Sequence, residues 1–156
     1  MTATGVTYCM DSSAWIDAAV NYPPEAFPSF WSRLDDLANR GRIVSPGEVR
    51  VEVQKKSNFI ATWTKGRPHL FVPLDETLMQ RATLILSQFP GMALAGGKQN
   101  TADPWVVALA CERGLTVVTQ ERGGSPQFPR IPKVCTEFKV PCIKLIQLVI
   151  NERWTF

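Results

Sequence analysis

The chain has 156 residues, of which 45% are hydrophobic and 20% charged. This length and composition fit a single domain over residues 1–156 with a hydrophobic core, and they exclude a chain that is disordered by composition. The formal net charge of +3 is compatible with a nucleic-acid partner but too small to require one.

The N-terminal half alternates short apolar runs with stretches of helical spacing. The first apolar run ends at Asp11, a first helix is broken by Pro23 and Pro24, and a second helix ends at Gly41. In chain order we expect a strand over 6–10, helices over 14–20 and 27–39, a strand over 42–44, a helix from Pro46 to about Lys56, a weaker helical stretch over 57–64 and a short strand over 70–72.

The C-terminal half continues this alternation. In chain order we expect a helix capped by Asp75 and running to about Gln88, a glycine-containing loop over 90–99, a helix from Asp103 to Glu112 that Gly114 stops, a buried strand over 115–119, a polar loop over 120–132 and a last strand over 142–145. Strands that alternate with helices predict a three-layer α/β/α sandwich around a parallel sheet of about four to five strands. Ligands of such sheets bind beyond the carboxyl ends of the strands.

Several acids fall at these strand ends. Asp11 follows the first strand, Glu121 follows the strand over 115–119, and Asp103 begins the preceding helix. If the sheet closes as expected, these carboxylates converge on one rim, where they repel each other unless a cation lies among them. Oxygen ligands of this kind select Mg²⁺ or Mn²⁺, which activate water and stabilise charge on a phosphate.

The helix after the second strand offers two more acids, Glu48 and Glu52, which lie one turn apart on the same face. Glu52 is flanked by Val51 and Val53, whereas Glu48 lies in the first turn, where the helix dipole favours a carboxylate in any case. We therefore prefer Glu52 as a ligand and keep Glu48 as the alternative.

Each of the other acids also has a purely structural interpretation. Asp11 precedes two serines and is suited to cap the first helix, and Asp103 before Pro104 is a typical helix start. Glu121, in a polar loop, has the pattern of a solvated charge.

The order of these residues resembles the PIN-domain family of metal-dependent nucleases. The matching segments are YCMDSSAWI, IVSPGEVRVEV, ADPWVVALA and LTVVTQE, and an uncharacterised bacterial subgroup is matched by YPPEAFPSFW and RIPKVCTEFKVPCIKL. The resemblance covers roughly residues 6–146. It assigns the metal and catalytic site to Asp11, Glu52, Asp103 and Glu121.

The resemblance also implies a PIN-like fold and a function. PIN nucleases cleave single-stranded RNA with Mg²⁺ or Mn²⁺, leaving a 3′-hydroxyl and a 5′-phosphate, and often act as the toxin of a toxin–antitoxin pair. One departure stands out, because most members have Asp where this chain has Glu121. That change can shift or weaken a second metal site, in which case Thr119 or Ser125 is placed to supply an oxygen.

The cysteines indicate a reducing compartment. Cys9, Cys111, Cys135 and Cys142 form no C-x-x-C pair and have no zinc-ligand spacing with the single histidine, His69. The first residues lack the pattern of a secretion signal, and no apolar run approaches the length of a bilayer span. We therefore expect a cytoplasmic protein with no membrane partner.

Basic residues in two places are candidates for contacts with an RNA backbone. The first group has two equally supported interpretations, an RNA path or an ordinary solvated helix face with Trp63 in the core, and comprises Lys55, Lys56, Lys65 and Arg67 beside Trp63 and His69. The second group lies in or beside the loop after Glu121 and comprises Arg122, Arg130 and Lys133.

Aromatic residues are concentrated in the first two helices. Trp15, Phe27, Phe30 and Trp31 are best interpreted as core. Any exposed part of this stripe would suit a partner protein or a homodimer contact.

Two functions remain open from the sequence. The first is a metal-dependent endoribonuclease in which Asp11, Glu52 and Asp103 bind the ion and Glu121 completes the site or orients water. The second is a non-catalytic PIN-like module that binds RNA or protein.

Overall fold

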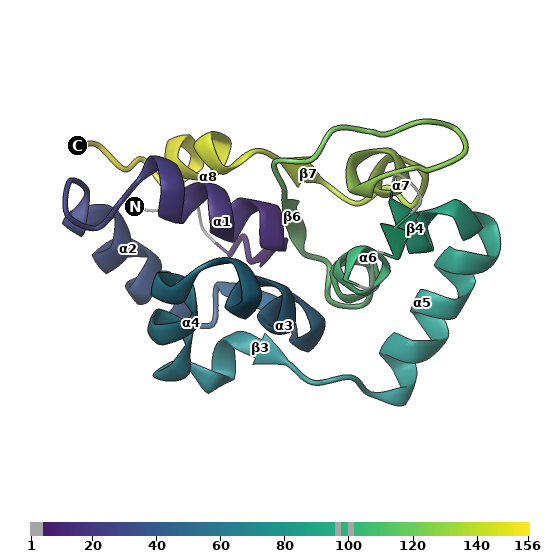
Figure 1. Cartoon of the computed structure of the whole chain (residues 1–156), viewed down its shortest axis with the longest axis horizontal. Coiled ribbons are helices and arrows are strands. Elements are labelled where there is room, and N and C mark those ends of the chain that lie inside the picture. The colour runs from purple at the N-terminus through teal and green to yellow at the C-terminus, as the bar shows by residue number, and fades with distance from the viewer. Residues whose placement is uncertain (1–4, 96–97, 100–101) are drawn as a thin grey trace.

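The computed structural model describes residues 5–95, 98–99 and 102–156 and contains a sheet of five parallel strands (Figure 1). The strands are β1 (Tyr8–Met10), β2 (Ile43–Pro46), β3 (Phe71–Val72), β6 (Thr116–Val118) and β7 (Cys142–Ile143). Their order is β3-β2-β1-β6-β7, so the first strand of the chain lies in the middle. Tyr8 pairs with Ile43 on one side and with Thr116 on the other. The predicted parallel sheet is confirmed.

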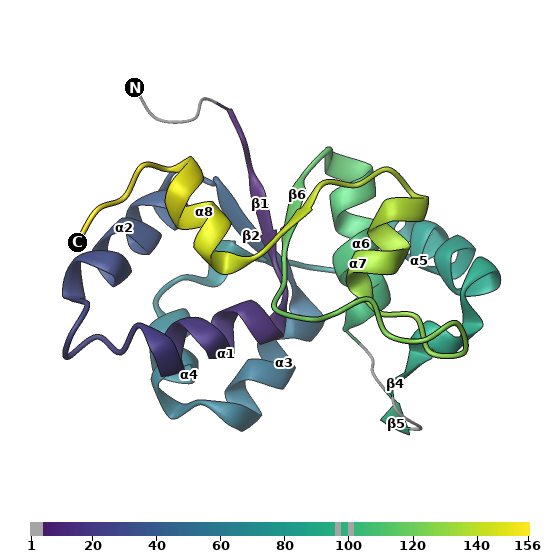
Figure 2. The same ribbon diagram turned by 90° about the horizontal axis from the view of Figure 1, so that it is seen from above.

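Helices cover both faces of the sheet, which confirms the predicted three layers (Figure 2). One layer contains α1 (Ser12–Asn21), α2 (Pro28–Asn39), α3 (Gly47–Lys56), α4 (Asn58–Lys65) and α8 (Leu145–Asn151). The other contains α5 (Glu76–Gln88), α6 (Asp103–Arg113) and α7 (Ile131–Glu137). Within the described part of the chain, no helix has both the length and the apolar composition needed to cross a membrane.

The core is built around β1, because helices pack on both of its faces. All three residues of this strand are fully buried. Helix α6 contacts β1, β2 and β6, and its residues Val106–Ala110 are buried against them. The helix ends at Gly114, whose φ of +66° is a left-handed conformation that glycine adopts without strain. This stop turns the chain directly into β6.

The aromatic stripe belongs to the core, as expected. Trp15 and Phe30 are fully buried and Trp31 is 5% exposed, while Phe27 packs against the same cluster from its margin. A homodimer through these side chains therefore has no support from their exposure.

Two C-terminal helices were not predicted. The end of the expected loop over 120–132 begins α7, and Leu145, expected in the last strand, is the first residue of α8. Each helix has only seven residues, too few for a periodic apolar pattern to separate helix from strand.

The expected loop over 90–99 also has structure. It contains the 3₁₀-helix η2 (Pro90–Ala93) and an antiparallel pair of two-residue strands, β4 (Leu94–Ala95) and β5 (Lys98–Gln99). The rest of that loop, residues 96–97, lies outside the described residues. A second 3₁₀-helix, η1 (Pro68–Leu70), precedes β3.

Candidate active site

The four acids singled out in the sequence all lie near the carboxyl ends of the central strands. Asp11 directly follows β1, and Glu121 lies just beyond β6. Glu52 lies on α3, which begins where β2 ends, and Asp103 is the first residue of α6. Parallel strands bring their carboxyl ends to one edge of a sheet, which is why residues so far apart in sequence meet here.

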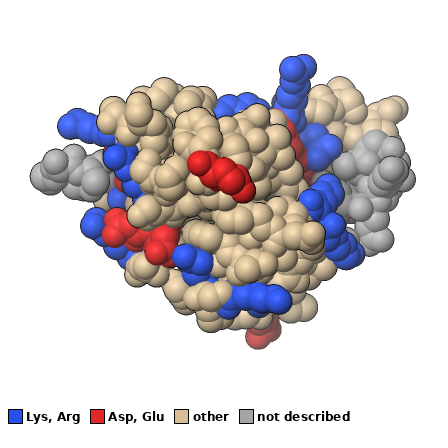
Figure 3. All heavy atoms as spheres, turned by 60° about the vertical axis from the view of Figure 1, so that its left-hand side comes forward, with Lys and Arg blue, Asp and Glu red and all other residues tan. Residues whose placement is uncertain are grey.

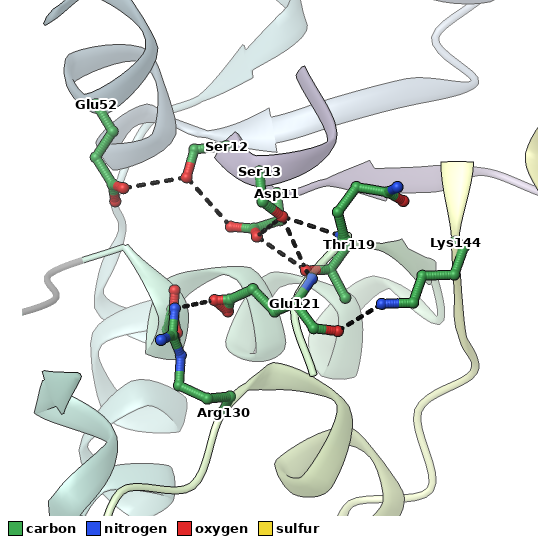
Figure 4. A network of polar contacts seen from close by, with 10 residues as sticks. Asp11, Ser12, Ser13, Glu52, Thr119, Glu121, Arg130 and Lys144 are labelled. Carbon is green, nitrogen blue, oxygen red and sulfur yellow. Dashed lines mark hydrogen bonds and ion pairs between the residues drawn. The ribbon is translucent and has the colours of Figure 1, made fainter. Parts of the chain in front are cut away.

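Asp11 is the centre of the polar network at this edge (Figure 4). Its side chain is 1% exposed. Its Oδ2 accepts hydrogen bonds from Ser13 Oγ at 2.7 Å and Thr119 Oγ1 at 3.0 Å. Although Asp11 occupies the N-cap position of α1, its carboxylate makes no capping hydrogen bond to that helix. Capping is therefore not what fixes this carboxylate.

Glu52 is joined to Asp11 through one serine. Ser12 Oγ lies 3.0 Å from Glu52 Oε2 and 3.4 Å from Asp11 Oδ1. Burial first, and then the charge of Asp11, raise the pKa of Glu52 against the opposing hydrogen bond from Ser12. Among the described hydrogen bonds none joins Glu48 to this network, so the geometry favours Glu52 of the two.

Asp103 and Glu121 form a second buried pair. Asp103 is 2% exposed and the Glu121 side chain 9%. Burial first, and then the charges of Glu121 and Asp11, raise the pKa of Asp103, and burial followed by Asp11 raises that of Glu121. The predicted interpretation of Glu121 as a solvated charge is therefore wrong. So is the prediction that Asp103 caps α6, because Ala102 is the N-cap and no side chain caps this end.

Arg130 is the counter-ion of this second pair. Its Nη2 donates a short hydrogen bond to Glu121 Oε2, and its Nε lies 3.4 Å from Asp103 Oδ2. The second contact is an ion pair without hydrogen-bond geometry, since both atoms lack a hydrogen-bond partner. The sequence marked Arg130 only as a candidate phosphate contact. Its pairing with Glu121, nine residues earlier in the chain, and with Asp103 has no local signal.

Thr119 and Ser125 were both candidates to supply an oxygen to the site. Thr119 Oγ1 contacts the Asp11 carboxylate and accepts a hydrogen bond from the Glu121 main-chain N–H. Ser125 Oγ instead accepts from the Phe128 main-chain N–H within its own loop. Ser13 orients Asp11, and Ser12 links Asp11 to Glu52.

The donor chemistry of this edge fits a hard divalent cation. Glu52 Oε1, Asp103 Oδ2 and Glu121 Oε1 are buried without a hydrogen-bond partner, and a cation is the simplest group that would satisfy them. Glu48 Oε2 on α3 is buried without a partner as well. As the side chains stand, however, the described residues contain no group of three or more His, Cys, Asp or Glu placed to hold an ion. Metal binding would require the Asp11–Glu52 pair and the Asp103–Glu121 pair to converge further.

A hollow of about 350 Å³ opens beside the acids. Thr119 and Glu121 belong to its lining, to which Arg122 and Lys144 contribute positive charge. Lys144 Nζ donates a hydrogen bond to the main-chain oxygen of Glu121 at 2.7 Å, which holds the positive Lys144 side chain next to the site (Figure 4).

The other predicted basic group is partly structural. Arg67 Nε donates to Asp35 Oδ1 at 2.6 Å, and its Cζ lies 3.9 Å from the centre of the Trp63 ring. Trp63 in turn packs against Trp15 and Trp31. On the face that Figure 3 shows, Lys and Arg side chains lie mostly toward the margins, and Asp and Glu side chains lie between them. Trp63 is thus partly buried and packs against the core.

Comparison with known proteins bears on the fold. Residues 8–156 match the profile of a family described as "Domain of unknown function (DUF4411)". The crystal structure of PAE2754 from Pyrobaculum aerophilum is similar, with a TM-score of 0.55, 15% identity and coverage of 96% of this chain and 98% of that one. No curated protein matches the sequence.

A second similar structure is that of VapBC2 from Rickettsia felis bound to a DNA fragment from their promoter. It has a TM-score of 0.51 and 14% identity, and the match covers 89% of this chain and 98% of that one. At such identities the likenesses show the fold alone. That fold is PIN-like, as the sequence resemblance predicts.

Proposed function

We propose that this chain, which belongs to the DUF4411 family, is a divalent-metal-dependent ribonuclease that hydrolyses single-stranded RNA at the acidic edge of its PIN-like sheet. The observation that carries the proposal is the set of buried carboxylate oxygens of Glu52, Asp103 and Glu121 that lack a hydrogen-bond partner. Buried acids in excess of their partners are costly for folding, so their presence at a ligand-binding edge argues for function.

In this proposal Asp11, Glu52, Asp103 and Glu121 would hold Mg²⁺ or Mn²⁺. When bound, the ion would supply an activated water and stabilise charge on the scissile phosphate. Ser13 and Thr119 keep the Asp11 carboxylate oriented, and Ser12 couples it to Glu52.

The substrate class follows from the surroundings of the acids. Arg122 and Lys144 line the hollow beside Glu121 and are suited to contact the phosphates of a strand leaving the site. A strand without a complementary partner fits best, because it can bend its backbone into a buried edge.

The likeness to VapBC2 supports a role in a toxin–antitoxin pair. We infer that an antitoxin protein is the partner of this chain in the cytoplasm. Removal of this partner would release the RNase activity of the chain. We further propose that two copies of the chain form a homodimer.

One observation favours the alternative of a non-catalytic RNA- or protein-binding module. The acids stand as two separate pairs, and Arg130 neutralises one of them. If the pairs never converge, the site would bind RNA or protein without cleaving it.

The deciding experiment combines Mn²⁺ binding with cleavage of mixed single-stranded RNAs, in Mn²⁺ and in chelator. We expect the wild type to cleave only with the ion and Asp11→Asn to lose both binding and cleavage. Asp36→Asn is the matched control, because Asp36 forms an exposed ion pair with Arg40 at the end of α2. Binding without cleavage would favour the alternative module, and an Asp11→Asn chain that cleaves like the wild type would refute the assignment.

A further inference from the structure

Arg130 brings a permanent positive charge into the acidic edge. Its guanidinium faces Asp103 through Nε and Glu121 through Nη2, and about one third of its side chain is exposed. A guanidinium does not lose its proton in proteins, so this charge is present at every pH at which the chain folds.

The loop between β6 and α7 is shaped to place this side chain. The Arg130 main-chain N–H donates to Gly123 O at 2.9 Å, and its carbonyl accepts from Val134 N as the N-cap of α7. Gly124 has a φ of +78°, and a Cβ there would lie 2.6 Å from Arg130 Cγ and 2.4 Å from Phe128 O. Only glycine leaves room for the arginine in this position.

The location of Arg130 limits how many ions the site can hold. Two ions that contact one phosphate lie about 3.5–4 Å apart. If the first ion takes the Asp11–Glu52 pair, a second ion would have to take its ligands from the Asp103 and Glu121 carboxylates. These are the carboxylates that the guanidinium already faces. A divalent ion placed there would meet a fixed cation at close range, which strongly disfavours binding.

We propose that Arg130 takes the place of a second metal ion, so that each chain binds one divalent ion and uses the guanidinium as its other positive group. The inference rests on the proposed function and specifies its metal site. One divalent ion with one guanidinium leaves at most one of the four carboxylate charges unbalanced, whereas two ions with Arg130 would make the edge positive.

The test counts the Mn²⁺ ions bound per chain by calorimetry and by the electron paramagnetic resonance signal of free Mn²⁺. We expect one ion for the wild type and two for Arg130→Gln, because the freed carboxylates then accept a second ion. Arg130→Lys keeps the charge and should still bind one ion. Lys133→Gln is the matched control with one ion, since Lys133 pairs with Glu137 on the exposed side of α7.

A second variant secures the result if Arg130→Gln does not fold. Gly124→Ala should displace the loop main chain at Phe128 and with it the Arg130 side chain, while the charge stays on the chain, and it should likewise bind two ions. Two ions on the wild type, or one ion on every folded variant, would overturn the inference and leave the proposed function standing. A wild type that binds no Mn²⁺ would instead refute the proposed function itself.

Discussion

Strand β1 carries a buried charged cluster at each end, and the two clusters are built differently. At the amino end, Glu152 Oε2 accepts from Tyr8 Oη at 2.7 Å and from Arg42 Nη2 at 2.8 Å, while Oε1 accepts from Arg42 Nη1 at 2.8 Å. One acid there has two full partners. At the carboxyl end, Arg130 pairs with only two of the four acids among the described residues, Asp103 and Glu121. Three of the four acids retain buried oxygens without a hydrogen-bond partner.

The comparison separates a cluster that serves the fold from the cluster that we propose as the active site. Glu152 and Arg42 tie the C-terminal helix to the start of the sheet, and burial, then Glu152, raises the pKa of Tyr8 so that its hydroxyl remains a donor. Asp11, only three positions after Tyr8, lies among acids whose pKa values are raised by burial and by each other. Buried charged groups that have all their hydrogen-bond partners serve the fold. Buried carboxylates that lack such partners are available to bind a cation.

The largest expected effect is on stability at the amino end. Arg42→Gln leaves Glu152 buried without its ionic partner, so we expect the free energy of unfolding to fall by about 3–5 kcal/mol. Urea unfolding measures this loss, and Mn²⁺ binding by the remaining folded protein should be unchanged. A loss below about 1 kcal/mol would show that the two ends do not differ as described.

The next effect distinguishes two acids on one helix. Glu52→Gln should weaken Mn²⁺ affinity and cleavage about 100-fold, whereas Glu48→Gln should change them little, because only Glu52 is linked to Asp11 through Ser12. Titration calorimetry of both variants checks the difference. Equal losses would place Glu48 in the site as well.

A smaller effect concerns the group that orients Asp11. Ser13→Ala removes the 2.7 Å hydrogen bond to Asp11 Oδ2 but leaves that from Thr119, so Mn²⁺ affinity should fall about 10-fold. Ser87→Ala on the exposed face of α5 is the control, and an unchanged affinity in Ser13→Ala would mean that the serine only supports the fold.

The smallest expected effect is a gain in stability. Burial, and then Glu121 and Asp11, raise the pKa of Asp103, so its stabilising contribution is complete at low pH and is lost as the pH rises through the folded-state pKa. Without metal at neutral pH, Asp103→Asn should therefore raise stability by about 1 kcal/mol, or about 2–4 °C in Tm. Thermal unfolding in chelator should show a gain that shrinks toward pH 4. A lower Tm for the variant at neutral pH would contradict this.

Local signals predicted most of the fold and the acids themselves. The apolar run before Asp11, the β-branched run Leu115–Val118 and the Asp103-Pro104 helix start each announce an element within a few residues. What the sequence did not disclose depends on contacts between distant segments. Arg130 reaches Asp103 across the loop, and Tyr8 bonds Glu152 from the other end of the chain. Such pairings have no periodicity to detect.

The most direct test of the account is a crystal structure with Mn²⁺ and an anomalous difference map at the manganese absorption edge. We predict a single peak within about 2.5 Å of an Asp11 carboxylate oxygen and of an oxygen from Glu52 or Asp103, with Arg130 still beside Glu121. A map with no peak at this edge, from a chain that nevertheless cleaves RNA, would contradict it.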